Sequence, residues 1–380
     1  MKLLLIGGTG ILSTDIRELA LEKGIDVYIL NRGRKEKEML NDKIHVIIGN
    51  IRNVEDTKEK IKDLYFDVVI DFLSYTKEQL ENTLSIFNGK CDQFIFISSA
   101  TAYRKTKPNE KITEETELYN PDWKYSLDKI ECEKLLEENF RKNGQKYTIV
   151  RPYVTYSNKR IPFAIIPQHK QWSLANRIIL GKPIVLWDGG KAICTLTSTK
   201  DFAEGMIGLF KNEKAYQEAF HITTDKTLTW RQALEYIGQA IGKEPIIADI
   251  PSEFIVKEIP ELKGVLYGDK GLDRIFDNAK IKSVTNFNPK IEFKDGIKDT
   301  IKYYQEYDYM RTIDYEWDAR MDHLIEKYNK YLKEKTFDKK IISNRVHNKN
   351  QNLKEKIIYH LCRNDLTYSM YTSIKRKIRS

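Results

Sequence analysis

The first 150 residues alternate between short apolar runs and longer stretches whose apolar residues recur at helical spacing. The apolar runs predict β-strands at 2–6, 26–30, 44–48, 67–72, 93–98 and 147–151. The stretches between them predict helices at 11–23, 54–63, 77–88 and 124–142. Apolar strands that alternate with helices predict an α/β fold, with a doubly wound parallel sheet covered by helices on both faces.

The pattern becomes less regular beyond residue 160, where prolines interrupt it at positions 162, 167, 183 and 251. Helices are predicted near 230–242, 294–306 and 312–336, which indicates a smaller α+β domain followed by a helical extension. No apolar run approaches the roughly 18 residues of a membrane-spanning helix. The apolar run at 3–6 is too short for a signal peptide.

The positions of the cysteines, histidines and charged residues limit which metal sites, disulfides and partners the protein could have. The four cysteines lie far apart without a CxxC pair, which disfavours a zinc or disulfide scaffold and fits a reducing cytoplasm. The six histidines are scattered, so we expect no metal site. The net charge is +9, and residues 331–380 carry all of the excess, because they hold 13 Lys and Arg against 4 Asp and Glu. This basic end could contact an anionic surface or partner, or could be a solvated tail.

A glycine-rich turn follows the first predicted strand. Gly7, Gly10 and Ser13 form a GxxGxxS pattern between that strand and the first helix. Glycine lets the backbone turn sharply and approach a pyrophosphate, and the helix start offers N–H groups and a positive dipole end. The context predicts a Rossmann-type dinucleotide site. An ordinary strand–helix turn is the alternative.

The residues after the second strand indicate which dinucleotide fits. An NAD site usually has Asp or Glu there to bind the ribose 2′-OH, whereas an arginine accommodates a 2′-phosphate. This chain has Asn31 and Arg32 and no acid, which slightly favours NADP over NAD. The alternative is that Arg32 is a solvated loop charge.

Hydroxyl groups and a Tyr–Lys pair form the candidate catalytic set. Ser99 follows the buried strand at 93–98, at the end of a parallel sheet where ligands bind. Tyr125 and Lys129 are four residues apart, so a helix presents them on one face. A nearby ammonium favours the phenolate, which can remove a proton from a substrate hydroxyl as hydride leaves the same carbon.

With these residues in place, the chain resembles the extended short-chain dehydrogenases/reductases, in particular the NAD-dependent sugar-nucleotide epimerase/dehydratase group. The resemblance covers roughly residues 1–305. The matching residues are the GGTG turn, Gly49 to Arg52, Ser99 before Ala-Thr-Ala-Tyr, Tyr125 with Lys129, Arg151 to Tyr153, Thr199 to Ala203, and Pro289. The motifs are specific for the superfamily and poor for the substrate.

The resemblance implies a bound NAD(P) and a transient ketone. It makes Tyr125 the base, lets Lys129 hold the ribose and tune Tyr125, and lets Ser99 polarise the reacting oxygen. The cofactor would contact Gly7, Thr9, Gly10, Ile11, Asn31, Arg32, Asn50, Ile51, Asp71, Phe72, Leu73, Lys129 and Tyr153. The substrate would contact Ser99, Ala100, Thr101, Tyr125, Thr155, Arg177 and Lys191.

Departures from the family pattern bear on the reaction. Dehydratases of this group usually carry an Asp-Glu pair where this chain has Ala100 and Thr101, so epimerisation or reduction is favoured over 4,6-dehydration. Relatives that hold a nucleotide diphosphate often have an arginine where this chain has Cys194. The contact of that arginine with the phosphate is therefore lost here, unless Lys191 or Arg177 supplies it. The GGTG and Asn31-Arg32-Gly33 pattern also resembles a branch with RNA-binding proteins.

We therefore expect a dinucleotide-binding Rossmann domain at 1–160, an interleaved and mainly substrate-binding domain at 161–310, a helical extension at 311–336 and a basic tail at 337–380. The favoured function is an NAD(P)-dependent epimerase of a sugar nucleotide or related sugar. The alternatives are an NADPH-dependent reductase of a keto-sugar or similar carbonyl, and a non-enzymatic dinucleotide- or RNA-binding relative. The resemblance also implies a homodimer.

Overall fold

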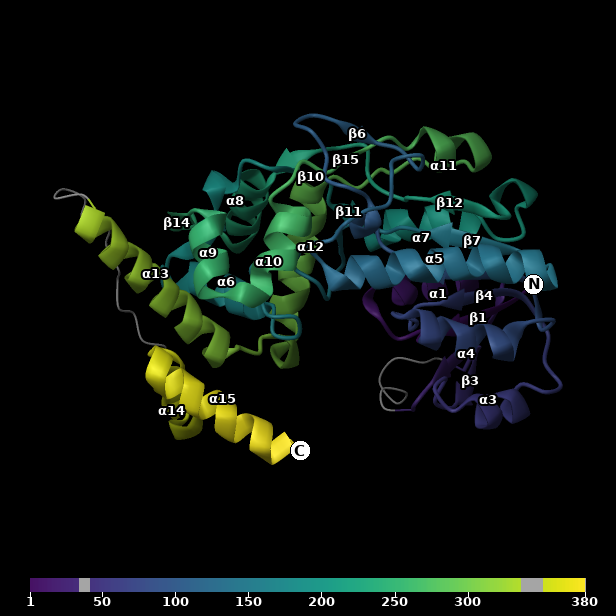
Figure 1. The fold of residues 1–380 in the computed structure, drawn as a ribbon, viewed down its shortest axis with the longest axis horizontal. Helices are drawn as coiled ribbons and strands as arrows, with labels where there is room; N and C mark the ends of the chain where they lie inside the picture. The colour runs from purple at the N-terminus through teal and green to yellow at the C-terminus, as the bar shows by residue number, and fades with distance from the viewer. Residues whose placement is uncertain (34–41, 336–350, 380) are drawn as a thin grey trace. The chain divides into compact units, whose positions relative to one another are not determined.

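The computed structural model describes residues 1–33, 42–335 and 351–379 (Figure 1). The chain divides into two compact units, each built from several segments. Unit 1 consists of Met1–Ser157, Cys194–Thr227 and Leu272–Glu292, and unit 2 consists of Asn158–Ile193, Leu228–Gly271 and Phe293–Ser380. Among the described residues, no helix is long and apolar enough to cross a membrane.

Unit 1 contains a parallel sheet of seven strands, which confirms the predicted α/β fold. The strand order β12-β7-β5-β4-β1-β2-β3 reverses between β4 and β1, and such a reversal opens a crevice at the carboxyl ends of the strands. The strand β12 was not predicted, because its three residues are too few to show a hydrophobic period. The strands are β1 (Lys2–Ile6), β2 (Asp26–Asn31), β3 (Ile44–Ile48), β4 (Phe66–Asp71), β5 (Cys91–Ile97), β7 (Tyr147–Val150) and β12 (Glu218–Phe220).

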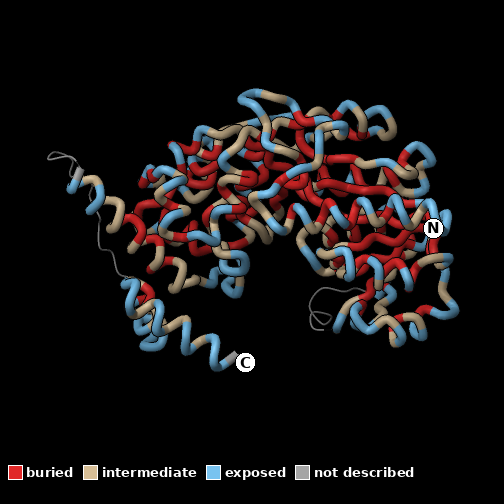
Figure 2. The backbone as a smooth tube through the Cα atoms, in the orientation of Figure 1, coloured by how far each residue is buried: buried red, intermediate tan, exposed pale blue. Residues whose placement is uncertain are grey.

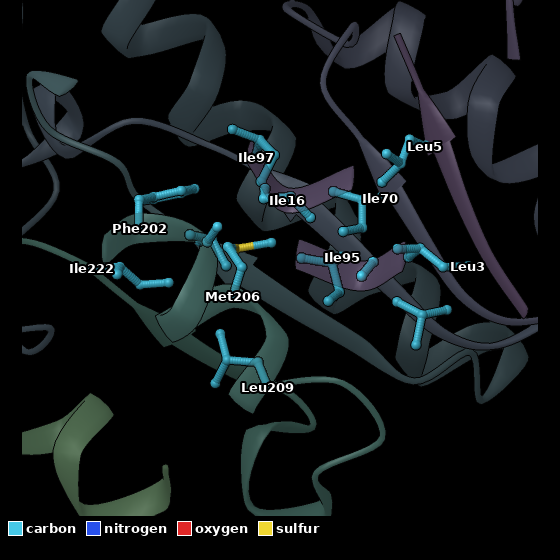
Figure 3. Packing of buried hydrophobic residues seen from close by; sticks show 14 of the residues in the cluster. Leu3, Leu5, Ile16, Ile70, Ile95, Ile97, Phe202, Met206, Leu209 and Ile222 are labelled. Carbon is cyan, nitrogen blue, oxygen red and sulfur yellow. The ribbon is translucent and has the colours of Figure 1, made fainter. Parts of the chain in front are cut away.

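Both faces of this sheet are apolar because side chains alternate along each strand. In β1, Leu3 and Leu5 join the core that faces α1 and α7, whereas Leu4 and Ile6 join the core beneath α4 and α5. Figure 3 shows the first of these cores, in which Met206 of α7 lies among the strand side chains. Each fully buried leucine or isoleucine contributes about 1.5–3 kcal/mol, so burial on both faces dominates the stability of unit 1.

Helices cover the two faces of the sheet. The helices at 11–22, 54–60, 77–87 and 124–143 were predicted, whereas those at 199–208 and 279–284 were not. The helices of unit 1 are α1 (Ile11–Glu22), α3 (Val54–Lys60), α4 (Lys77–Phe87), α5 (Lys124–Asn143), α7 (Thr199–Gly208) and α11 (Ala279–Val284), with short 3-10 turns at η1 (Ala100–Ala102) and η3 (Glu213–Ala215). Gly144 ends α5 in the left-handed conformation, a common helix stop.

Later segments of the chain return to unit 1 through short parallel strand pairs. β8 (Thr155–Tyr156) pairs with β11 (Thr197–Ser198), and β6 (Lys111–Ile112) pairs with β15 (Ile275–Phe276). At the start of α7, the Asp201 carboxylate accepts hydrogen bonds from the backbone of Lys290 (3.1 Å) and Ile291 (2.9 Å). These contacts explain why unit 1 is discontinuous in sequence.

Unit 2 is mainly helical around one parallel strand pair, β9 (Ile184–Trp187) with β14 (Ile247–Ile250). An aromatic core forms beside the pair, where the Phe163 ring lies 5.5 Å from Trp187 and 6.1 Å from Trp230. The helices are α6 (Trp172–Leu180), α8 (Trp230–Ile241), α9 (Ser252–Glu258), α10 (Lys263–Val265), α12 (Phe293–Glu306), α13 (Tyr315–Lys335), α14 (Leu353–Cys362) and α15 (Asp365–Arg379). Short turns are η2 (Asp188–Gly190), η4 (Pro260–Leu262), η5 (Leu266–Lys270) and η6 (Asp308–Met310).

The C-terminal region is helical where the structure describes it. The helix predicted at 312–336 is present as α13, and the described part of 337–380 forms the two further helices α14 and α15. Residue 336, the end of the predicted helical extension, and residues 337–350, the start of the predicted basic tail, lie outside the described residues. One two-residue strand, β10 (Ile193–Cys194), and another, β13 (Leu228–Thr229), complete the described elements.

Candidate active site

The turn between β1 and α1 has the geometry of a phosphate cradle. Gly7 has φ +91°, a conformation that L side chains rarely adopt, and a Cβ there would lie 2.8 Å from the Leu73 side chain. A Cβ on Gly8 would lie 2.9 Å from Ile29. Backbone hydrogen bonds hold the turn, from Gly7 to Leu30 O (3.0 Å) and from Thr9 to Gly7 O (2.8 Å). The turn therefore requires glycine at positions 7 and 8.

The start of α1 suits an anion. Its first turn contains no acidic residue, and the first N–H groups of a helix, here beginning with Ile11, lack partners within the helix. Ser13 Oγ accepts the Gly10 N–H at 2.9 Å, so this serine stabilises the turn. Arg17 is buried and its Nη1 donates to Gly8 O at 3.3 Å. Sequence reasoning missed Arg17, although a lone arginine one residue from the apolar stripe of α1 was a usable signal.

The ends of β2 and β3 carry the residues predicted to meet the adenosine half of the cofactor. Asn31 Oδ1 accepts the Gly33 N–H at 2.8 Å, and Asn50 Oδ1 accepts the Arg52 N–H at 3.2 Å. Each amide therefore shapes the loop after its strand. Arg32 is exposed, whereas Ile51 is buried.

At the end of β4, a buried carboxylate has hydrogen-bond donors on only one of its two oxygens among the described residues. Asp71 is fully buried, and its Oδ1 accepts hydrogen bonds from the N–H groups of Leu73 (2.8 Å) and Ser74 (3.1 Å). Its Oδ2 has no hydrogen-bond partner among the described residues. Such an atom is costly unless a ligand completes its hydrogen bonding. Phe72 and Leu73 follow it, and Leu73 also packs against the glycine turn.

Lys129 of α5 lies in the interior of unit 1. Its Nζ donates to Ser74 O and to Ile97 O, both at 2.7 Å, and lies 4.5 Å from the Phe96 ring centre. Burial lowers the pKa of Lys129 to about 8, and the nearby Asp71 carboxylate only partly opposes this. The ammonium thus joins the ends of β4 and β5.

Tyr125 lies one turn before Lys129 and is half-buried. The Lys129 Nζ is 5.9 Å from the centre of the Tyr125 ring, so the two project from α5 together as predicted from their spacing. The rings of Trp123 (5.6 Å) and Tyr75 (6.4 Å) flank Tyr125. This aromatic surround restricts how the phenol can turn.

A chain of hydroxyl groups links Ser99 to the first turn of α5. Ser99 Oγ and Thr101 Oγ1 are 2.9 Å apart, and Ser126 Oγ donates to Thr101 Oγ1 at 2.9 Å. Asn120 Nδ2 donates to Thr101 O at 2.7 Å. Ser126 directly follows Tyr125, so these hydrogen bonds tie the segment that carries Ser99 to the helix that carries Tyr125. Neither Ser126 nor Asn120 was identified from the sequence.

Behind the serine segment lies a buried ion pair. Glu133 of α5 accepts from Ser98 Oγ (2.5 Å) and pairs with Arg151 Nη2 (2.7 Å). Arg151 Nη1 donates to the Tyr103 hydroxyl at 3.1 Å, and that hydroxyl lies 3.2 Å from His221 Nδ1. Burial lowers the pKa of His221 to about 4, so its ring is neutral at pH 7. This network fixes the segment that carries Ser99.

The predicted substrate residues Ala100 and Thr155 and the predicted cofactor residue Tyr153 are also buried. Ala100 is fully buried and donates its N–H to Pro152 O at 2.9 Å. The Tyr153 ring lies 5.1 Å from the Phe276 ring, and Thr155 is buried in β8 opposite Thr197.

Arg177 and Lys191 lie in unit 2. Arg177 is buried, and its guanidinium pairs with Asp318 (2.5 Å) and Asp322 (2.9 Å) and donates to Pro183 O. These contacts give Arg177 a structural role between α6 and α13, so we leave it out of the proposed site. Lys191 is exposed just after η2.

Comparison with known proteins places this geometry in a family. Residues 3–222 match the NAD dependent epimerase/dehydratase family. Chloroplast stem-loop binding protein of 41 kDa b from Arabidopsis thaliana is 26% identical over 79% of this chain and 78% of that protein. UDP-N-acetyl-alpha-D-glucosaminuronate decarboxylase from Bacillus cytotoxicus is 23% identical over 80% of this chain and 98% of that protein.

A solved structure shows the same fold. UDP-glucuronic acid 4-epimerase from Bacillus cereus, in complex with UDP-glucuronic acid and NAD, superposes with a TM-score of 0.65 at 18% identity. The superposition covers 81% of this chain and all of the epimerase. The family match spans the glycine turn, Ser99, Tyr125 and Lys129. The chain therefore belongs to the NAD dependent epimerase/dehydratase family.

Proposed function

We propose that the protein is an NAD(P)-dependent epimerase of a sugar nucleotide or a related sugar, which acts through a transient keto intermediate. The observation that carries this proposal is the grouping of Ser99, Tyr125 and Lys129 at one edge of the sheet, joined by the Ser99–Thr101–Ser126 hydroxyl chain. These are the groups that hydroxyl oxidation needs: a base, a cation beside it and a hydrogen-bond donor.

Each residue has a defined task in this proposal. The Tyr125 hydroxyl, as phenolate, takes the proton of the substrate hydroxyl and later returns it. The Lys129 ammonium favours that phenolate because opposite charges attract strongly away from water. Ser99 donates a hydrogen bond to the reacting oxygen, and Thr101 and Ser126 orient the Ser99 hydroxyl. When bound, NAD(P) would take up a hydride from the substrate carbon and give it back.

The residues of unit 1 fit a dinucleotide. Gly7 and Gly8 have no room for a side chain, and α1 begins directly after the turn with its first N–H groups unpaired within the helix. The buried Asp71 carboxylate retains an oxygen without a hydrogen-bond partner among the described residues. Gly7, Thr9, Gly10 and Ile11 would hold the pyrophosphate. Asn31, Arg32, Asn50 and Ile51 would meet the adenosine half. Asp71, Phe72, Leu73, Lys129 and Tyr153 would meet the nicotinamide half.

The substrate class is inferred from the relatives and from the site. The named decarboxylase and 4-epimerase act on UDP-sugars according to their names, and the chain aligns with them over most of its length. Ala100 and Thr101 stand where acid–base chemistry at neighbouring sugar carbons would need carboxylates, which favours epimerisation over dehydration. Ser99, Ala100, Thr101, Tyr125 and Thr155 would contact the sugar.

Two alternatives each have one supporting observation. Arg32 without an acid beside it favours a 2′-phosphate, which supports an NADPH-dependent reductase. The stem-loop binding relative, at 26% identity, supports an RNA-binding protein with an unused site.

Cofactor release from the purified protein separates these functions. Denaturation should release near-stoichiometric NAD(P)+, as expected of an enzyme that returns hydride to the same substrate. An empty protein that binds NADPH reversibly would favour the reductase. A protein that binds neither dinucleotide would refute both enzymatic readings.

Catalysis can then be tested with UDP-glucose and UDP-glucuronic acid as probes. Tyr125→Phe should lower turnover by about 10²–10⁴-fold while cofactor stays bound. The matched control is Tyr119→Phe, because Tyr119 is 57% exposed in the same segment and should tolerate the change. Equal activity of both variants would rule out Tyr125 as the base.

A further inference from the structure

The C-terminal helix α15 carries an apolar stripe that faces away from the rest of unit 2. Leu366, Met370, Ile374 and Ile378 recur every four residues, and they are 73%, 61%, 57% and 79% exposed. Four-residue spacing places them on one side of the helix. We call these four residues the exposed stripe. Figure 2 shows α15 as a largely exposed helix near the C-terminus.

The preceding helix also exposes apolar side chains. Leu353 and Ile357 of α14 are also four residues apart and are 75% and 50% exposed. The two helices are consecutive, separated by the Arg363–Asn364 turn, and pack against each other. Six large aliphatic side chains are thus exposed on a helical hairpin, which is unusual for residues that prefer burial.

The opposite face of the hairpin is firmly attached to α13. Tyr359 and Cys362 are buried with Ala319, and the Tyr359 hydroxyl donates to Asp322 at 2.5 Å. On α15, Lys375 pairs with Glu316 at 2.5 Å. The hairpin therefore uses one face for its own fold, and the exposed stripe is not needed to hold it in place.

Basic residues accompany the stripe. Arg376 and Lys377 are exposed in the last turn of described α15, and the last residues of the chain read Lys-Arg-Lys-Ile-Arg-Ser. Residues 351–380, which include both helices, hold seven Lys and Arg against two Asp and Glu, whereas residues 1–330 carry equal numbers of acidic and basic residues. The combination of aliphatic and basic side chains is complementary to a surface that has anionic groups outside and an apolar layer beneath them.

We propose that α14 and α15 dock the protein on an anionic lipid bilayer, with the exposed stripe inserted among the acyl chains near the headgroups. A helix of 15 residues is about 22 Å long, enough to lie in the interface but not to span it. Nucleic acid would be bound by the basic residues without using four aliphatic side chains, so the lipid surface accounts for more of the structure. The proposal does not depend on the reaction.

Co-sedimentation of the full chain with vesicles tests the docking. The protein should partition onto vesicles of equal parts phosphatidylglycerol and phosphatidylcholine, and far less onto phosphatidylcholine alone. The double variant Met370→Asp/Ile374→Asp should weaken partition at least roughly tenfold, because charged side chains cannot enter the acyl region. Met370→Ser/Ile374→Ser provides a milder variant if the first misfolds. Ile48→Asp, at a 56% exposed residue of β3, is the control and should bind like wild type.

A second pair of variants tests the charge. Arg376→Gln/Lys377→Gln should weaken partition roughly thirtyfold, at about fivefold for each basic residue, and added salt should do the same. The matched control is Lys302→Gln/Lys330→Gln, because these lysines are 74% and 80% exposed elsewhere in unit 2. Controls that weaken binding equally would refute a localised docking surface.

Other partners give different outcomes, and each would overturn the proposal. Equal binding to both kinds of vesicle, or unchanged binding of both stripe variants, excludes docking through the stripe on an anionic surface. A dimer in sedimentation velocity that the stripe variants abolish, without vesicle binding, makes the stripe an interface between copies. Binding of an RNA stem-loop that needs Arg376 and Lys377 but not the stripe, without vesicle binding, makes nucleic acid the partner.

Discussion

Two buried cationic centres of this protein contrast in how their charge is balanced. In unit 2, Arg177 and Lys182 meet the carboxylates of Asp318 and Asp322 at 2.5–2.9 Å, so every charge has an opposite charge in contact. In unit 1, Lys129 is held by two neutral carbonyl groups, and no carboxylate among the described residues pairs with it. A compensated centre stabilises a fold, whereas an uncompensated cation has charge left to act on a neighbour such as Tyr125.

The largest effect should come from removing the uncompensated charge. Lys129→Met should lower turnover by about 10²–10⁴-fold, because the Tyr125 phenolate loses its neighbouring cation. Stability should change little at pH 7, since the buried ammonium carries a desolvation cost that methionine avoids. Steady-state kinetics and urea unfolding of the same preparation measure both. A strongly destabilised but active variant would reverse the contrast between the two centres.

The compensated centre should respond in the opposite way. Asp318→Asn leaves Arg177 and Lys182 short of one carboxylate and should cost about 3–5 kcal/mol of unfolding free energy. Activity per folded molecule should remain. Asp308→Asn is the control, because its side chain is 87% exposed and its loss should cost less than about 0.5 kcal/mol. Equal unfolding midpoints for the two variants would contradict the structural role.

The lowered pKa of Lys129 makes the contrast depend on pH. As pH rises through about 8, Lys129 loses its charge, so turnover should fall on the alkaline side. Stability should move the other way, because between about pH 8 and 10.5 the unfolded lysine binds more protons than the folded one, and unfolding free energy rises with pH. Lys129→Arg should remove the alkaline loss of turnover. A pH profile that is identical in wild type and Lys129→Arg would exclude Lys129 as its origin.

Unit 1 also contains a buried ionisable group, His221, for which we expect an effect on stability alone. Its pKa of about 4 lies below the usual 6.5, so the unfolded state binds more protons between these values. Unfolding free energy should therefore fall by about 3 kcal/mol as pH drops from 6.5 to 4. The decrease should be smaller in His221→Gln. Identical pH dependence of urea midpoints in both proteins would show that His221 does not carry this effect.

The smallest expected effect tests the hydroxyl chain. Ser126→Ala removes the donor to Thr101 Oγ1 and should lower turnover roughly tenfold, with a stability cost of about 1 kcal/mol. Ser126→Thr keeps the hydroxyl and should recover part of the turnover, as a merely volumetric effect would not. A turnover of Ser126→Ala equal to wild type would separate Ser99 from the chain.

The sequence allowed most of the fold to be predicted, for identifiable reasons. The strands β1 to β5 each contain at least three consecutive apolar residues, and the glycine turn marks where the first helix begins. β12 was missed because Glu218–Phe220 pairs with β7 only after a long return of the chain. Local periodicity cannot reveal a strand that its neighbour creates.

The site was predicted in part. The i, i+4 spacing of Tyr125 and Lys129 carries its own geometry, so their common face followed from helix periodicity. Partners distant in sequence, such as Ser126 with Thr101 or Arg177 with Asp318, depend on tertiary packing that no local pattern encodes. The sequence pattern around an arginine in a helix is the same whether its guanidinium binds a phosphate or pairs with a buried aspartate.

The interleaving of the two units has a consequence for synthesis on the ribosome. The chain crosses between units after Ser157, Ile193, Thr227, Gly271 and Glu292. Strands β1 to β7 emerge first, but the edge of β7 stays open until β12 emerges from the ribosome some seventy residues later. Open strand edges recruit other chains, so the nascent protein passes through a window in which it needs protection. Slow translation between residues 157 and 220 would lengthen that window, which links the yield of folded protein to codon usage in this stretch.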